Sequence, residues 1–433
     1  MNIVVGVIVG LIVLMLLVVL HEAGHFIAAR RSGVRVLEFG IGFPPRAVAW
    51  IKDPTTHKWR KLKKSEWSKG GVTKTVLSDE NAAEIAEKTQ ALASSDKTPT
   101  KEKLIADGLI FSINWLPIGG FCQMDGESAA DTRRGTFGKA SFPKKTKILF
   151  AGVAMNWLAA FVILTVLAWT GMPTFLDNQF TVASDTRVDA APVEVVEVVE
   201  GSPAAKAGFL TGDKIIKAGD NEVSSGSAVN SYNKEHAGKE AEYTVLRGDT
   251  TETLTATLNP DDSEYYLGIA MQSTQTLSYS TWSAPIVGAG LTLQVTGETF
   301  KGVGDLIWNL VSGVGRLFSF DSSVRESGQE AISTVGDSVS GPVGIIGVLF
   351  PSFTAAGPTN LAFLAAIISI SLACMNVLPI PALDGGRWLL IAIYKLRRKK
   401  LTKEIEQKIV ARSMYALLAL MVVVTILDIT RFF

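Results

Sequence analysis

The chain has 433 residues, of which 47% are hydrophobic and 19% are charged, and its formal net charge at pH 7 is +1. This composition is typical of a membrane protein with a sizeable polar portion. The two cysteines, Cys122 and Cys374, fall in different regions, which excludes a disulfide framework, and we expect no nucleic-acid partner.

Charge is distributed unevenly along the chain. Residues 26–147 carry 22 Lys and Arg against 13 Asp and Glu, whereas residues 171–360 carry 10 against 23, and residues 387–408 carry 8 against 2. Basic segments that flank membrane spans stay in the cytoplasm. We therefore expect the acidic stretch to face outward and both termini to lie outside.

Four apolar segments fit this alternation as membrane-spanning helices. They cover residues 1–31, 147–171, 358–381 and 412–432. The first lacks the basic start and the cleavage site of a signal peptide. The fourth has only 15 uncharged residues, 413–427, against the roughly 20 that a helix needs to cross. The chain is thus predicted to be an α-helical polytopic membrane protein.

The first span ends in the sequence His21-Glu22-Ala23-Gly24-His25. Residues i and i+4 share one face of a helix, so both imidazoles can bind one metal ion. Glu22, the residue after His21, then lies beside the ion. Two histidines and a third ligand leave a position on zinc for water, whose proton a nearby carboxylate can take. The pattern also occurs by chance in soluble helices, but ionisable residues at membrane depth indicate a functional site.

The third ligand is expected on the inner side of the membrane, where the charge pattern places His25. The stretch from Asn376 to Gly386 (NVLPIPALDGG) ends the third span with two prolines, an acid and two glycines, and it opens a predicted cytoplasmic loop at 382–411. Asp384 is therefore the predicted third ligand. The alternative is His57, which also lies on the inner side.

The cytoplasmic region, residues 32–146, is predicted to hold two apolar hairpins that lie against the membrane, at 33–50 and 113–125. Strand edges near a catalytic helix could hold an extended substrate by main-chain hydrogen bonds, and a purely structural hairpin is the alternative. The glycines proposed for this substrate contact are Gly40, Gly42, Gly119 and Gly120. Between the hairpins, residues 52–107 form a polar insertion with a short helix predicted at 81–92.

A compact α+β domain is predicted at 183–272, in the outward segment. A strand at 193–199 precedes a short Ala-rich helix, a Gly-Asp turn and a second strand within 201–216 (GSPAAKAGFLTGDKII). This order resembles a PDZ domain of the bacterial protease type. Such domains bind extended peptide ends at a sheet edge; a domain that only blocks bulky substrates is the alternative. Residues 282–357 are predicted as amphipathic surface helices followed by a partly inserted segment.

The pair HEAGH and NVLPIPALDGG, with a PDZ domain between the second and third spans, resembles the site-2 protease family of intramembrane zinc metalloproteases (peptidase family M50). The bacterial regulator-of-sigma-E proteases are the most similar branch. The stretches RRSGVRVLEFGIGF, LPIGGF, FAGVAMN and SGPVGIIG extend the similarity over nearly the whole chain outside the insertion. This chain departs from that branch in having one predicted PDZ domain instead of two, and its insertion has no counterpart there.

The resemblance implies that His21, His25 and Asp384 bind one zinc ion per chain, that Glu22 activates water, and that Asn376 helps to hold substrate. The implied substrates are single-pass membrane proteins, either anti-sigma factors already trimmed by another protease or remnant signal peptides. The implied location is the bacterial cytoplasmic (inner) membrane, with the lipid bilayer as partner, the PDZ domain outside and the active site near the cytoplasmic side. The alternatives are a pseudoprotease scaffold that binds without cutting and a transporter with broken helices.

Overall fold

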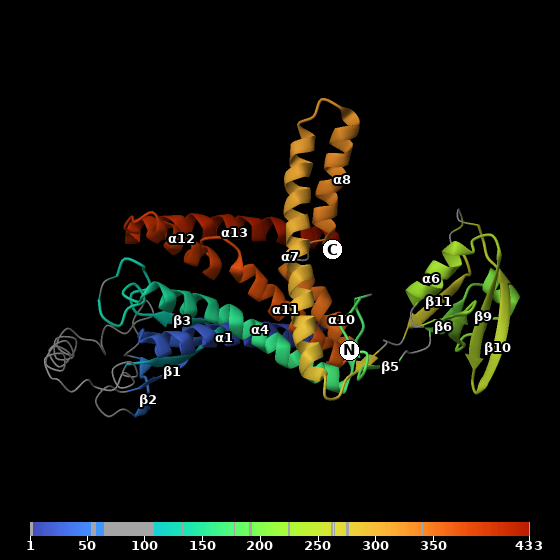
Figure 1. The fold of residues 1–433 in the computed structure, drawn as a ribbon, viewed down its shortest axis with the longest axis horizontal. Helices are drawn as coiled ribbons and strands as arrows, with labels where there is room; N and C mark the ends of the chain where they lie inside the picture. Colours follow the sequence, from blue (N-terminus) through green and yellow to red (C-terminus); the bar gives the residue numbers. More distant parts are fainter. Residues whose placement is uncertain are drawn as a thin grey trace. The chain divides into compact units, whose positions relative to one another are not determined.

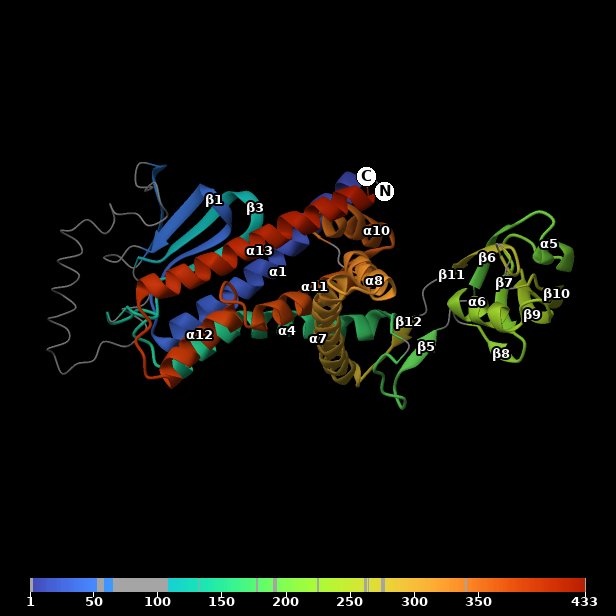
Figure 2. The same ribbon diagram turned by 90° about the horizontal axis from the view of Figure 1, so that it is seen from above.

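The computed structural model describes residues 3–52, 58–64, 108–131, 133–176, 178–189, 193–223, 226–260, 263, 265–273, 277–338 and 341–432 (Figures 1 and 2). The chain divides into two compact units. One contains Met1–Ile163 and Thr292–Phe433, and the other contains Leu164–Leu291.

Among the described residues, four helices are long and apolar enough to cross a membrane, the same number as the predicted spans. They are α1 (Ile3–Ser32), α4 (Phe142–Thr170), α11 (Pro358–Val377) and α13 (Lys403–Phe432). The last helix begins at Lys403, earlier than the predicted 412. Glu404 and Glu406 lie in its first turn, where acidic side chains favour a helix start.

Glycines on α1 allow a second apolar segment to pack closely against this helix. The segment runs through α9 (Pro342–Gly344), a π-helical turn η2 (Ile345–Leu349) and α10 (Phe350–Ala355), and it is too short to span a membrane. A side chain on Gly10 would overlap the Phe350 ring, since an added Cβ would lie 2.6 Å from it. Small residues at such positions let membrane helices approach one another.

Asp428, a buried residue of α13, holds the start of this inserted segment. Its carboxylate accepts hydrogen bonds from the backbone N–H groups of Gly341, at 3.0 Å, and Gly344, at 2.9 Å. The first N–H groups of a helix have no partner within the helix, so an acceptor from elsewhere stabilises its beginning. The contact ties the last membrane helix to the segment that packs on the first.

The strands between the first two long apolar helices form one interlocked sheet instead of the two predicted hairpins. Strand β1 (Val36–Lys52) and strand β3 (Ile110–Met124) each bend in the middle, and β2 (Trp59–Lys61) pairs with the end of β1. Ile113 of β3 pairs with both Ile41 and Val48 of β1, so the first arm of β3 lies between the two arms of β1. Each segment therefore finds its hydrogen-bond partners in the other segment and not across its own turn.

A buried ion pair joins the two arms of β1 across this sheet. Glu38, on the first arm, faces the guanidinium of Arg46, on the second, with Arg46 Nε donating to Glu38 Oε1 at 2.9 Å. The Ser112 hydroxyl of β3 donates to the same carboxylate oxygen at 2.6 Å. The three side chains are 1%, 8% and 2% exposed. A buried charge needs such partners because its desolvation is costly.

The second unit holds a sheet with the strand order β10-β9-β7-β6-β11, with β8 (Asn221–Glu222) beside β7. The strands are β6 (Val193–Val198), β7 (Lys214–Ala218), β9 (Glu240–Arg247), β10 (Thr250–Thr257) and β11 (Ile269–Ser273). The short helix α5 (Pro203–Ala207) and the helix α6 (Gly226–Glu235) accompany the sheet, whose core includes Val195, Ile215 and Tyr243. The strand, helix and strand predicted over 193–216 are present in that order.

Three short strands and two long helices complete the description. The strands β4 (Met172–Pro173), β12 (Leu277–Tyr279) and β5 (Arg187–Asp189) pair in that order. The helices are α7 (Ala284–Leu317) and α8 (Ser322–Ser338). Their connection carries two exposed rings, Phe318 at 82% and Phe320 at 104% of full exposure. Amphipathic helices with apolar side chains exposed in this way are typical of the membrane surface.

Candidate metal centre

The structure brings His21, His25 and Asp384 together. His21 Nε2 lies 3.1 Å from Asp384 Oδ2, His25 Nε2 lies 3.2 Å from the same oxygen, and the two Nε2 atoms are 3.1 Å apart. Both histidines are buried in the C-terminal part of α1, whereas Asp384 begins α12 (Asp384–Leu396). Two segments that are 363 residues apart in the sequence therefore converge on one point.

Two glycines let the chain place Asp384 there. Helix α11 ends at Val377, before the prolines at 379 and 381, and the chain folds back so tightly that Gly385 touches the carbonyl group of Val377. Gly386 lies in the same way against the backbone of Ile380. A Cβ at either glycine would overlap these atoms, so the Gly-Gly pair permits the return that carries the acid to α1.

The donor atoms fit a zinc ion. His25 Nδ1 lies 2.8 Å from the carbonyl oxygen of Ile148, which can only accept, so Nδ1 carries the hydrogen and Nε2 presents a lone pair. That lone pair faces a carboxylate and a second imidazole, an arrangement that a cation stabilises. A tetrahedral zinc site with bonds of about 2.0–2.1 Å has ligand atoms about 3.3–3.4 Å apart, close to the spacing found here. Two histidines and one carboxylate are also a usual zinc ligand set.

Glu22 lies close to the two histidines but farther from their ring nitrogens than Asp384 does. A carboxylate oxygen of Glu22 and the ring nitrogens of both histidines lie within 4.8 Å of one another. The backbone N–H of Cys122, in the second arm of β3, lies near the Glu22 carboxylate. One acid is thus in contact with the imidazole nitrogens, and the other is set back from them, beside the second arm of β3.

The four predicted substrate-contact glycines have different surroundings. A Cβ on Gly119 or Gly120 would lie 3.3 and 3.2 Å from the side chains of Val18 and Val19, so the second arm of β3 runs along α1 just before the histidines. Gly40 pairs with Phe121 on one side and Ser112 on the other, which leaves no open strand edge there within the described sheet. Gly42 lies at the bend of β1, with a positive φ of 76°.

For two other predicted site residues, the described part of the chain shows no contact with the metal centre. The Asn376 side chain donates to the carbonyl oxygen of Leu372, in its own helix, at 2.9 Å, so its role toward substrate stays a prediction. His57, the alternative ligand, and the helix predicted at 81–92 both lie outside the described residues.

Helix α4 supplies contacts to the histidines that the sequence reasoning missed. Besides the carbonyl group of Ile148, the side-chain amide of the fully buried Asn156 lies 3.3 Å from His21 Nδ1. The Ser369 hydroxyl of α11 donates to the backbone carbonyl oxygen of Asn156 at 2.9 Å. This bond joins α4 to α11 beside the histidines. The signal in the sequence is the stretch FAGVAMN, residues 150–156, which carries part of the family resemblance but does not indicate a contact with a histidine.

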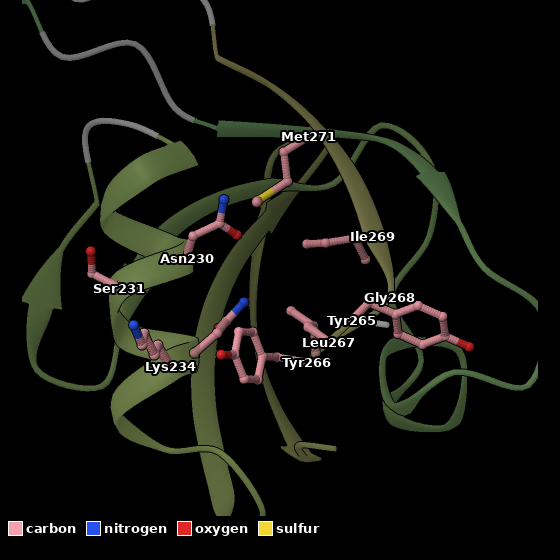
Figure 3. A pocket seen from close by; sticks show the side chains of 10 residues that line it. Asn230, Ser231, Lys234, Tyr265, Tyr266, Leu267, Gly268, Ile269 and Met271 are labelled. Atoms are coloured by element: carbon pink, nitrogen blue, oxygen red, sulfur yellow. The ribbon is translucent and has the colours of Figure 1, made fainter. Parts of the chain in front are cut away.

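A separate groove lies within the second unit, between α6 and the chain that leads into β11 (Figure 3). Its volume is about 470 Å³. Figure 3 shows Asn230 and Lys234 of α6 on one side and Leu267, Ile269 and Met271 on the other. β11 is the last strand of its sheet and pairs with β6, so the other edge of β11 borders the groove.

Comparisons with known proteins cover almost the whole chain. The model of peptidase family M50 matches residues 9–106 and 98–421. The regulator of sigma-W protease RasP from Bacillus subtilis (strain 168) is 28% identical, with 96% of each chain covered. The zinc metalloprotease RasP from Oceanobacillus iheyensis is 25% identical over 96% of this chain and 97% of that one. A putative zinc metalloprotease from Staphylococcus aureus (strain COL) is 27% identical over all of both chains.

One solved structure is similar to a fifth of the chain. It is the PDZ domain of an SdrC-like protein from Listeria monocytogenes, which is 24% identical and has a TM-score of 0.18. The match covers 20% of this chain and 92% of that domain.

Proposed function

The chain belongs to peptidase family M50 and is a membrane zinc metalloprotease of the site-2 type, and on that premise we propose which bonds it cuts and with which residues. It hydrolyses peptide bonds within the transmembrane segments of single-pass proteins, of the anti-sigma-factor or signal-peptide kind. His21, His25 and Asp384 hold one zinc ion per chain. The observation that carries this proposal is the convergence of their three ligand atoms within 3.1–3.2 Å of one another, beside the C-terminal part of a membrane helix.

The chemistry proposed for the site divides the work between the ion and Glu22. Zinc, when bound, supplies Lewis acidity, which makes water a nucleophile near neutral pH. Glu22 takes the proton of the attacking water and later gives it to the leaving amine. Its position beside the two histidines, near the backbone N–H of Cys122, supports this role.

The interlocked sheet is proposed to hold the substrate in an extended form. A helix hides its peptide carbonyls in its own hydrogen bonds, so a substrate helix has to unwind before attack. The second arm of β3 has β1 on one side, and it passes both Glu22 and α1. A substrate strand that pairs with the outer edge of this arm, near Gly119 and Gly120, would satisfy its backbone groups beside the base. Gly42 at the bend and Asn376 are proposed as further contacts.

The orientation and the PDZ groove are also part of the proposal. The excess of Lys and Arg over residues 26–147 and 387–408 supports a cytoplasmic position for the active site and an outer position for the second unit. The groove beside β11 then binds an extended peptide end from the outer part of a substrate. The alternative is a domain that only excludes intact substrates. Binding of a peptide in the groove supports the first account, and the absence of binding supports the alternative.

The test uses the whole protein in liposomes with a helical substrate. Wild type should contain one zinc ion and cut the substrate, and a chelator should abolish cleavage. Glu22→Gln should keep the zinc and lose cleavage, because it retains the ligands but not the base. Asp384→Ala should lose both, whereas His57→Ala should keep both. Cleavage by Glu22→Gln, or wild-type protein that binds zinc and substrate without cutting, would refute the proposed function.

A further inference from the structure

Helix α4 forms one wall of the metal centre without providing a ligand. Gly152 lies directly against the two imidazoles, since a Cβ built on it would lie 2.6 Å from Nε2 of both His21 and His25. Asn156, one turn further along α4, faces the other nitrogen of the His21 ring. Both positions belong to a membrane helix that Ser369 ties to α11.

The hydrogen on His21 decides whether this residue can bind a metal. For Nε2 to offer a lone pair, Nδ1 must carry the hydrogen and needs an acceptor. The Asn156 amide is placed with Nδ2 toward Nδ1, which leaves its oxygen, Oδ1, buried and without a hydrogen-bond partner among the described residues. A half-turn of the amide exchanges the two atoms, so that Oδ1 accepts the hydrogen bond from His21 Nδ1–H.

The histidines are thus held by α4 in two different ways. His25 donates to a backbone carbonyl, that of Ile148, which no substitution of the side chain at 148 removes. His21 depends on a side chain, Asn156, which substitution can remove. A second partner of this kind fixes the tautomer and the ring orientation of a metal-binding histidine.

We infer that α4 prepares the zinc site through two positioning residues: Asn156 holds His21 in the tautomer with hydrogen on Nδ1, and Gly152 leaves the space in which both Nε2 atoms and the ion meet. This inference rests on the metal site proposed above. It assigns no catalytic step to either residue, because neither one is a ligand of the ion or a base.

The experiment measures zinc affinity of the whole protein by competition with a chelator. Asn156→Leu, of similar size but without an acceptor, should bind zinc about 10- to 100-fold more weakly. Asn156→Asp should bind at least as tightly as wild type, because a carboxylate oxygen also accepts from Nδ1–H. The visible absorption of the cobalt-substituted protein should change in Asn156→Leu and stay that of wild type in Asn156→Asp.

Matched controls separate positioning from packing. Asn360→Leu removes another buried asparagine of a membrane helix, one that donates to the carbonyl oxygen of Ala356, and zinc affinity should not change. Gly152→Ala should lose zinc, whereas Gly302→Ala, on α7 with nothing within 4 Å of an added Cβ, should keep it. The melting temperature of each metal-free variant reports whether it folds.

The outcomes separate this inference from the proposed function. Wild-type affinity in Asn156→Leu would overturn the role of Asn156, as would equal losses in Asn156→Leu and Asn156→Asp, which indicate packing alone. If Asn156→Leu does not fold, weaker binding by the Asp variant still overturns that role. Zinc binding by folded Gly152→Ala would overturn the role of Gly152. Wild-type protein that binds no zinc would refute the proposed function itself.

Discussion

Substitution of Glu38 by Gln should destabilise the interlocked sheet by several kcal/mol. Glu38 and Arg46 join the two arms of β1 and are only 1% and 8% exposed. Gln keeps the length of the side chain but removes the negative charge that faces the guanidinium. Because water cannot reach the pair to compensate, the Arg46 charge then stays in a medium of low dielectric constant without the carboxylate.

The expected size of the effect follows from this burial. Removal of one partner of a buried ion pair costs about 3–5 kcal/mol, whereas an exposed pair contributes about 0–1 kcal/mol. The exposed pair between Asp131 and Arg133, whose guanidinium side chain is 67% exposed, provides the matched comparison. Replacement of both buried partners, by Glu38→Leu with Arg46→Met, should recover most of the loss because no unpaired charge remains.

The assay is unfolding of the purified protein in mixed micelles with increasing dodecyl sulfate, followed by tryptophan fluorescence. Trp50 lies on β1 and pairs with Phe111 of β3, so it reports on this sheet. Glu38→Gln should lose far more free energy of unfolding than Asp131→Asn, and the double variant should lie close to wild type. Equal effects of Glu38→Gln and Asp131→Asn, or a double variant weaker than either single one, would show that the pair does not hold the sheet.

Three further predictions concern other contacts. Asp428→Ala should speed hydrogen exchange of the backbone amides at the start of α9 and cost about 1–2 kcal/mol, because it removes the cap of that segment; unchanged exchange contradicts this. Hydrogen bonds from Ser283 and Thr281 lower the pKa of Asp185 to about 2. The contribution of this carboxylate to stability is therefore present above pH ~4 and is lost as the pH falls through about 2. The melting temperatures of wild type and Asp185→Asn should differ at pH 5 and converge near pH 2. Gly386→Ala should reduce zinc content, because its Cβ would displace the loop that carries the acid; a variant with full zinc content refutes that account.

The parts of this protein that could be predicted from its sequence are those whose signals are local. Hydropathy over about 20 residues marks a membrane helix, and the i, i+4 spacing alone places His21 and His25 on one face. Asp384 could be found because charge asymmetry limited the third ligand to one side of the membrane. The structure places this acid within 3.2 Å of both imidazoles, although 363 residues separate it from His21.

Features that depend on distant pairing could not be predicted. Apolar runs with turn residues indicated strands at 33–50 and 113–125, but no local pattern tells a strand whether its partner is its own second half or another segment. The same holds for Asn156, since a single amide in an apolar helix has no periodic signal, and its contact with His21 exists only after α4 packs on α1. The predicted span at 412–432 lies within α13, which begins earlier, at Lys403, because charge counts describe the lipid-crossing part and not the helix that extends beyond it.

The separation between the two halves of the metal centre has a consequence for biosynthesis. A ribosome delivers the histidines with the first helix, but the acid emerges only after more than 350 further residues. Throughout most of translation, the growing polypeptide therefore carries only two of the three proposed ligands. With the ligand set proposed above, the site is complete, and able to cut neighbouring proteins in the same bilayer, only after residue 384 has been made.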